Sequence, residues 1–169
     1  MNWANTLYIL LIIAVTALSG WMAFYSAKTP GIAGRRPFFC LAALIVLLAV
    51  LEGLSVVAPT VAWAHVWFDA RFISLALLPV VWLLFILEYT GNTRLTRRPV
   101  IAALLLIPAL TQVMIWTNSF HGLWTQKPVG FIQQGSFLIA QTAERIAGPW
   151  MWIHLSYSYA LTLAGLIVL

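Results

Sequence analysis

The stretch VWFDARFISLALLPVVWLLFILEY, Val66–Tyr89, decides the fold. Its charged residues lie near its two ends, and the residues between them are almost all apolar. A helix needs about 20 such residues to cross the hydrocarbon core of a bilayer. We therefore predict that this stretch is a membrane-spanning α-helix, and that Pro79 in its middle kinks it.

Four further stretches have the same character: residues 7–25, 38–57, 99–116 and 150–169. Of the 169 residues, 63% are hydrophobic and 8% are charged, and the mean hydropathy is +0.96. A soluble domain usually carries about a quarter charged residues, so this composition excludes an ordinary soluble protein. We predict an all-α fold, a polytopic transmembrane helix bundle with five spans in this chain.

The basic residues indicate the orientation of the bundle, because loops rich in Lys and Arg stay in the cytoplasm. The N-terminal tail and the link from Ala58 to His65 contain no Lys or Arg. Six of the nine basic residues lie in two alternate loops, as Lys28, Arg35 and Arg36 in one and Arg94, Arg97 and Arg98 in the other. We predict a multi-pass protein of the plasma membrane with its N-terminus outside and both basic loops inside.

The longest connection, residues 117–149, lies outside in this topology. A loop of that length usually has structure or a function of its own. Two short apolar runs, Phe131-Ile132 and Phe137-Leu138-Ile139, flank Gln133-Gln134-Gly135-Ser136 and predict a small β-hairpin lying on the membrane. The sequence is still strongly apolar at Leu169, and we expect the chain to be a piece of a longer protein.

Two opposite charges are predicted to lie inside the membrane at the same depth. Glu52 and Arg71 each lie about five residues from the same end of neighbouring antiparallel spans, roughly 7–8 Å below the surface of the hydrocarbon core. Charges at that depth are costly, so an ion pair is the first interpretation. The alternatives are a ligand or proton site, and two side chains that extend separately toward the surface.

Other polar residues recur in the last span and in the long loop. His154, Ser158 and Thr162 follow one another at a four-residue spacing and therefore share one helix face. Such a stripe usually packs against other helices through hydrogen bonds, and a ligand cavity is the alternative. His121 in the long loop is either an ordinary surface histidine or one that senses pH or contacts a ligand.

The sequence contains no pattern typical of catalysis. A single cysteine, Cys40, excludes an internal disulfide and a cysteine-built metal site. The three histidines lie at unrelated depths, so they do not supply the paired ligands of a membrane haem. We found no nucleophile motif, zinc-protease motif or phosphate-binding glycine loop. We predict no catalytic residue, metal or cofactor, and a lipid rather than a nucleic-acid partner.

An ordered set of short motifs runs along most of the chain. It consists of Phe72-Ile73, Pro79, Trp82-Leu83-Leu84-Phe85, Glu88-Tyr89-Thr90-Gly91, Ile107-Pro108, Trp116-Thr117-Asn118, His121-Gly122-Leu123-Trp124, Gly148-Pro149 and Tyr157-Ser158-Tyr159. This order resembles the N-terminal seven-transmembrane sensory region of membrane histidine kinases, which also precedes diguanylate cyclase modules. The most specific part is the proline with the aromatic helix end after it, followed by the Thr-Asn-x-x-His loop.

The resemblance implies seven spans, of which this chain holds five, and a role as a signal-input region. An extracellular or intramembrane stimulus would pass to a cytoplasmic output module of the same parent chain, in a homodimer. The input region itself is then not an enzyme. The candidate ligand-binding residues are Asn118, His121, Trp124, His154 and Ser158. A fragment of a small-molecule transporter or channel is the alternative, although no internal repeat is visible, and a membrane enzyme is the third.

Overall fold

The computed structural model describes residues 3–29, 31–142 and 145–169, and for residues 4–5 and 93–94 it describes the backbone alone. Within these residues, five helical segments are long and apolar enough to cross a membrane. They are α1 (Trp3–Lys28), α2 (Arg35–Val56), the consecutive helices α3 (Val61–Ala70) and α4 (Phe72–Tyr89), α5 (Arg98–Trp116) and α7 (Pro149–Val168). The predicted bundle with five helical spans is therefore confirmed.

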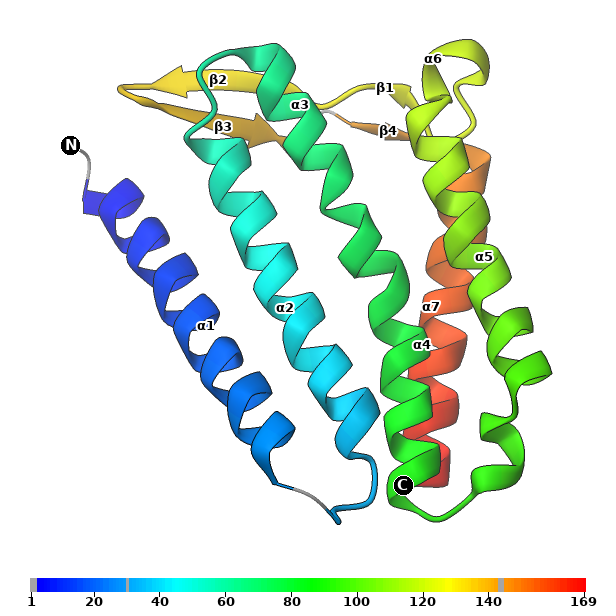
Figure 1. Cartoon of the computed structure of the whole chain (residues 1–169). Helices are drawn as coiled ribbons and strands as arrows, with labels where there is room; N and C mark the ends of the chain where they lie inside the picture. The colour runs from blue at the N-terminus through cyan, green and yellow to red at the C-terminus, as the bar shows by residue number, and fades with distance from the viewer. Residues whose placement is uncertain (1–2, 30, 143–144) are drawn as a thin grey trace.

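Helix α4 lies in the middle of the bundle, where it packs against α2, α5 and α7, whereas α1 packs mainly against α2 (Figure 1). Val80, Leu83 and Leu87 of α4 form a buried hydrophobic cluster with Leu161 of α7. The two helices approach closely at Gly165, where an added Cβ would lie 2.6 Å from Nε1 of Trp82. Small residues at helix contacts in membranes allow such close backbone packing.

The third span begins earlier than the sequence analysis suggested. We predicted a link from Ala58 to His65 and a helix from Val66, but α3 begins at Val61. Thr60 caps this helix, because its side-chain oxygen accepts a hydrogen bond from the backbone N–H of Trp63 at 3.4 Å. A threonine at this position satisfies an N–H group that has no partner within the helix.

In the residues of the long connection that the structure describes, there are a short helix and four strands. Strands β2 (Gly130–Gln134) and β3 (Phe137–Gln141) pair antiparallel around a turn at Gly135, which confirms the predicted hairpin. Leu138 of this hairpin packs against Ala58 and Ala64, so the hairpin covers the ends of α2 and α3 (Figure 1). The other elements are α6 (Asn118–His121), β1 (Thr125–Lys127) and β4 (Ile146–Ala147), and β1 pairs with β4.

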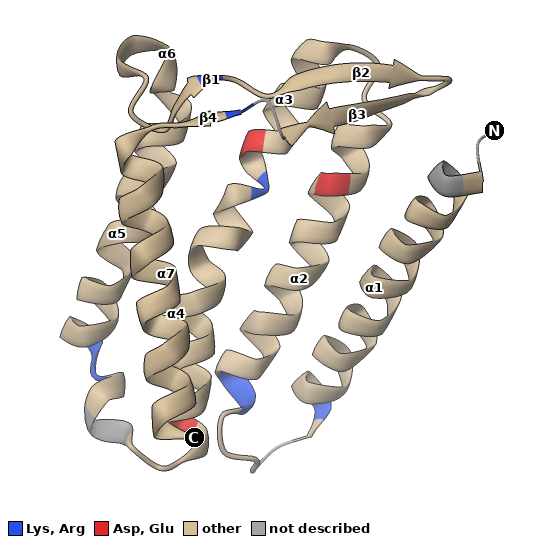
Figure 2. Ribbon diagram, turned by 180° about the vertical axis from the view of Figure 1, so that it is seen from behind, with Lys and Arg blue, Asp and Glu red and all other residues tan. Residues whose placement is uncertain are grey.

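The two ends of the bundle differ in charge. The strands lie at one end, which we call the strand end, and the loops α1–α2 and α4–α5 lie at the other, which we call the basic end (Figures 1 and 2). The basic end holds six of the nine Lys and Arg residues, whereas Glu88 is the only acid there among the residues that the structure describes. The 3-10 helix η1 (Thr93–Thr96) lies in the α4–α5 loop.

Candidate functional site

A cavity of about 500 Å³ opens at the strand end, between α3, the end of α5 and the segment 118–129. Its walls include His65, Phe68 and Asp69 of α3, and Asn118 and Trp124 of the long connection. Small-molecule sites usually have volumes of about 300–1,000 Å³ and combine apolar walls with a few polar groups. This cavity has the size and the lining of such a site.

Both signs of charge face this cavity, from Asp69 and Arg145. The guanidinium carbon of Arg145 lies 5.3 Å from the ring centres of Phe72 and of Trp124, so aromatic faces support the cation. Burial lowers the pKa of Arg145, and the neighbouring Asp69 carboxylate opposes that shift. An arginine remains charged under these conditions, so the cavity offers a fixed cation beside a carboxylate.

Asn118 was predicted as a ligand-binding residue, and the structure places it in the cavity wall. Its side-chain oxygen accepts hydrogen bonds from the backbone N–H groups of Trp124 and Thr125 at 2.9 and 3.1 Å. Its amide nitrogen donates to the carbonyl of Thr125 at 2.9 Å. These bonds fix the turn that carries Trp124, so Asn118 shapes the cavity by holding its wall.

His121 lies outside the cavity wall and is exposed. Its Nδ1 accepts a hydrogen bond from the backbone N–H of Leu123 at 2.9 Å, so the proton of the neutral ring lies on Nε2. Nε2 is 3.0 Å from the hydroxyl oxygen of Thr117, which in turn donates to the carbonyl of Val113. The structure therefore ties His121 to the end of α5 and to the backbone beside Trp124, outside the cavity wall.

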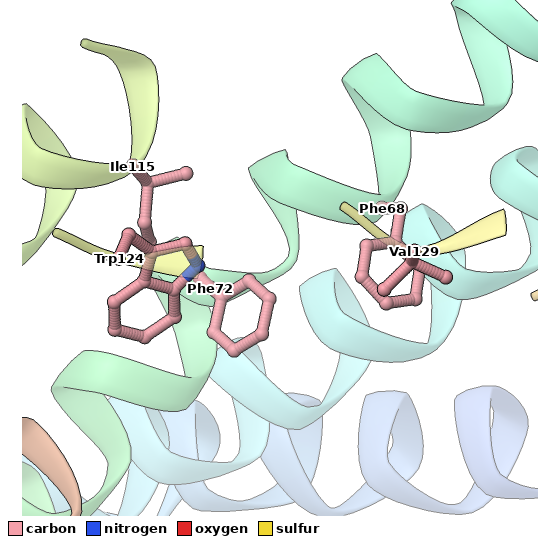
Figure 3. Close-up of a cluster of buried hydrophobic side chains, with 5 residues drawn as sticks. All are labelled: Phe68, Phe72, Ile115, Trp124 and Val129. Carbon is pink, nitrogen blue, oxygen red and sulfur yellow. The ribbon is translucent and has the colours of Figure 1, made fainter. Parts of the chain in front are cut away.

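Trp124 is the central side chain of the strand end and is 2% exposed. It belongs to a buried cluster with Phe68, Phe72, Ile115 and Val129 (Figure 3). Figure 3 shows its indole ring beside the aliphatic side chain of Ile115 and the ring of Phe72. Its ring meets Phe72 edge-on, with centroids 5.1 Å apart. This side chain joins the long connection to α4 and α5.

The same loop is bonded to the start of α7. The backbone N–H of Gly148 donates to the carbonyl of Trp124 at 2.9 Å, and that of Trp150 donates to the carbonyl of Leu123 at 3.0 Å. The two backbones touch at Gly148, where any Cβ would overlap the carbonyl of Leu123. Only glycine fits there, whereas in the sequence Gly148 stands out only as part of the Gly148-Pro149 motif.

His154 connects Trp124 to a polar network between α5 and α7. The Thr111 hydroxyl donates its one proton to the carbonyl of Ile107 at 2.8 Å. It therefore accepts from Nε1 of Trp150 at 3.1 Å and from Nδ1 of His154 at 3.2 Å. Nε2 of His154 is then the acceptor for the Ser158 hydroxyl at 3.4 Å.

The predicted polar stripe of the last span is only partly packed. His154 is buried and Ser158 is half-buried, whereas Thr162 is exposed and its hydroxyl donates to the carbonyl of Ser158 on the same helix. The His154 ring lies 6.0 Å from that of Trp124, centre to centre. The structure thus brings Trp124, His154 and Ser158 together, one below the other, along the start of α7.

Glu52 and Arg71 also meet, through an ion pair between α2 and the α3–α4 junction. A third group completes this cluster, because the Tyr8 hydroxyl of α1 donates to the other carboxylate oxygen of Glu52 at 2.7 Å. The guanidinium carbon of Arg71 lies 3.6 Å from the Phe68 ring centre. The cluster links three consecutive spans, and nothing local in the sequence indicated the role of Tyr8.

We expect the substitutions Glu52→Gln and Arg71→Met to be strongly non-additive. Removal of one partner leaves an uncompensated charge among the helices, which costs more than removal of both. Equilibrium unfolding in detergent micelles should give a coupling energy of about 1 kcal/mol or more between the two sites. Glu88→Gln with Arg71→Met is the matched control. These two residues lie toward opposite ends of the bundle, so the changes in free energy of unfolding that the two substitutions cause should add. Additive effects of Glu52→Gln and Arg71→Met would contradict the structural role of the pair.

Comparison with known proteins identifies the family. No curated protein and no solved structure gives a significant match to this chain. A family model described as the N-terminal 7TM region of histidine kinase matches residues 9–169. This match covers nearly the whole chain, including the loop motifs around Asn118 and Trp124 and all the spans but the start of the first. The chain therefore belongs to the family of N-terminal seven-transmembrane regions of histidine kinases.

Proposed function

We propose that this chain is the signal-input region of a membrane sensor kinase or a related signalling protein. In this proposal a stimulus acts in the cavity of the strand end, and its effect passes along α7 to a cytoplasmic output module beyond the basic end. The observation that supports it most is the position of Trp124. Its side chain lines the cavity and packs on α4, α5 and His154, while its backbone is bonded to the start of α7.

A stimulus changes output only if it binds one state of the bundle more tightly than another. A ligand in the cavity lies against Trp124, so a shift of this ring is the simplest way to favour one state. The ring contacts His154, whose hydrogen bonds join α7 to α5. Hydrogen bonds inside membranes contribute about 0.6 kcal/mol on average, so exchanging them shifts a balance without unfolding the bundle.

The proposal includes an orientation: the strand end faces outward, and both basic loops face the cytoplasm of a plasma-membrane protein. In a Cys40→Ser background, a cysteine at Gln126 should react with a membrane-impermeant maleimide added to intact cells. A cysteine at Thr96 should react only after the membrane is opened. Labelling of Thr96→Cys but not Gln126→Cys in intact cells would reverse the orientation and place the cavity on the cytoplasmic side.

Four alanine substitutions test the proposed signal route at the cavity and at α7. They are made in the full-length signalling protein, which we propose to be a homodimer. We expect His154→Ala and Ser158→Ala to change basal output, because they remove bonds between α7 and its neighbours. We expect Asn118→Ala and His121→Ala to reduce the response to stimulus instead, because they loosen the loop that carries Trp124. The measurement is autophosphorylation or reporter output at equal membrane levels.

The control for these variants is Thr162→Ala, which removes an exposed hydroxyl of the same stripe that bonds only its own helix. Its output should match that of the unchanged protein. If all four test variants behave like Thr162→Ala with and without stimulus, the stimulus acts elsewhere in the protein.

A further inference from the structure

The basic end contains two adjoining cavities that no step of the signalling proposal uses. The first, of about 310 Å³, is walled almost entirely by apolar surface, including Tyr25, Phe38 and Phe85. The second, of about 510 Å³, is lined by both Arg35 and Arg36 and by more polar surface. The two share residues 32–35 and therefore adjoin along the α1–α2 loop, and we call them together the basic-end groove.

We propose that this basic-end groove binds one anionic phospholipid of the adjacent leaflet. The phosphate would lie at the guanidinium groups of Arg35 and Arg36, and an acyl chain would occupy the apolar cavity against Phe38 and Phe85. Arginine side chains bind phosphate oxygens through paired N–H groups. Basic pockets between membrane helices on the cytoplasmic side are suited to acidic headgroups.

The charges around the groove favour an anion. The guanidinium group of Arg35 contacts the carbonyl of Thr29, with 3.5 Å between Nη1 and the oxygen. This weak contact orients the guanidinium group, and a neutral carbonyl leaves its positive charge uncompensated. Arg36 is exposed at the rim of the groove. One acid, Glu88, lines the polar cavity and opposes an anionic ligand. Two cations against one carboxylate leave the site positive.

The backbone of the loop contributes to the shape of the groove. Gly34 adopts a φ of 74° and starts α2 without a side chain. A Cβ at this position would lie 3.1 Å from the Phe85 ring, so glycine keeps the loop close to α4 above the apolar cavity. An acyl chain suits an apolar cavity that lies at the end of the spans and adjoins a second cavity lined by two arginines. This pairing of surfaces favours a lipid over a soluble anion.

Native mass spectrometry of the purified chain tests the proposal with lipids of identical acyl chains. We expect one phosphatidylglycerol molecule to bind more tightly than phosphatidylcholine. Each arginine near an acidic headgroup contributes roughly 1 kcal/mol, so Arg35→Gln with Arg36→Gln should weaken phosphatidylglycerol binding on the order of 25-fold. Glu88→Gln should strengthen it several-fold, and this gain does not depend on how well the double variant folds.

The matched control is Arg97→Gln with Arg98→Gln, which removes two exposed cations of the same end that do not line the groove. This control should keep nearly all of the phosphatidylglycerol binding. An equal loss in both double variants would mean a diffuse surface attraction and would overturn the site. Displacement of the lipid by an equal concentration of glycerol 3-phosphate would overturn the role of the acyl chain.

Discussion

Gly148→Ala is expected to destabilise the purified chain by about 2–4 kcal/mol, as the sum of overpacking and of lost backbone hydrogen bonds. A methyl group at this position overlaps the carbonyl of Leu123, which is backbone and cannot rotate away. The two backbone segments must therefore separate. The backbone hydrogen bonds from Gly148 to Trp124 and from Trp150 to Leu123 then lengthen. Equilibrium unfolding in detergent micelles, followed by circular dichroism, gives the change in free energy of unfolding.

Gly53→Ala is the matched control, because an added Cβ there meets only Ile12 at 3.6 Å, an ordinary contact. Alanine favours a helix over glycine by about 1 kcal/mol, so this variant should be as stable as the unchanged chain or more stable. A Gly148→Ala variant as stable as Gly53→Ala would mean that the long connection does not contact the start of α7 as described.

Trp124→Ala is expected to cost about 3–5 kcal/mol of stability, the range for removal of a large buried aromatic side chain. Its indole ring packs with Ile115 and lies beside the rings of Phe72 and His154. The same substitution should enlarge the cavity of the strand end, because Trp124 forms part of its wall. Unfolding in the same detergent measures the loss.

Trp152→Ala is the corresponding control for Trp124→Ala. Trp152 lies on the same helix as His154 but is 63% exposed, so its ring faces away from the bundle. Its removal should change the free energy of unfolding by less than about 1 kcal/mol. Equal losses for the two tryptophans would contradict the central position of Trp124.

Local sequence patterns predicted the spans well, because the length and apolar character of a membrane helix are properties of one continuous stretch. They also predicted the hairpin, since two short apolar runs flank a turn with glycine at a position of positive φ. The start of the third span was predicted too late, because Thr60 is an ordinary residue of a link unless its capping bond is seen. The Tyr8 hydrogen bond to Glu52 joins residues far apart in the sequence, and no spacing rule indicates it.

The candidate site was harder to predict than the fold. Asn118 and His121 were chosen as polar residues of a long loop, but their side chains bond the backbone of that same loop. A sequence does not reveal whether a polar side chain turns toward a ligand or toward its own main chain. Asp69 and Arg145, which face the cavity, come from segments far apart, so only the fold brings them together.

The measurement that tests the central proposal most directly is the basal output of the full-length signalling protein with Trp124→Ala. Leu51→Ala is the reference, because Leu51 is also buried, at 8% exposure, but lies on α2 and does not line the cavity. Both substitutions remove core packing, and output is compared at equal amounts of protein in the membrane. The proposal predicts that Trp124→Ala changes basal output and that Leu51→Ala leaves it unchanged. Unchanged output in both variants, or the same change in both, would contradict a signal route from the cavity through Trp124 to α7.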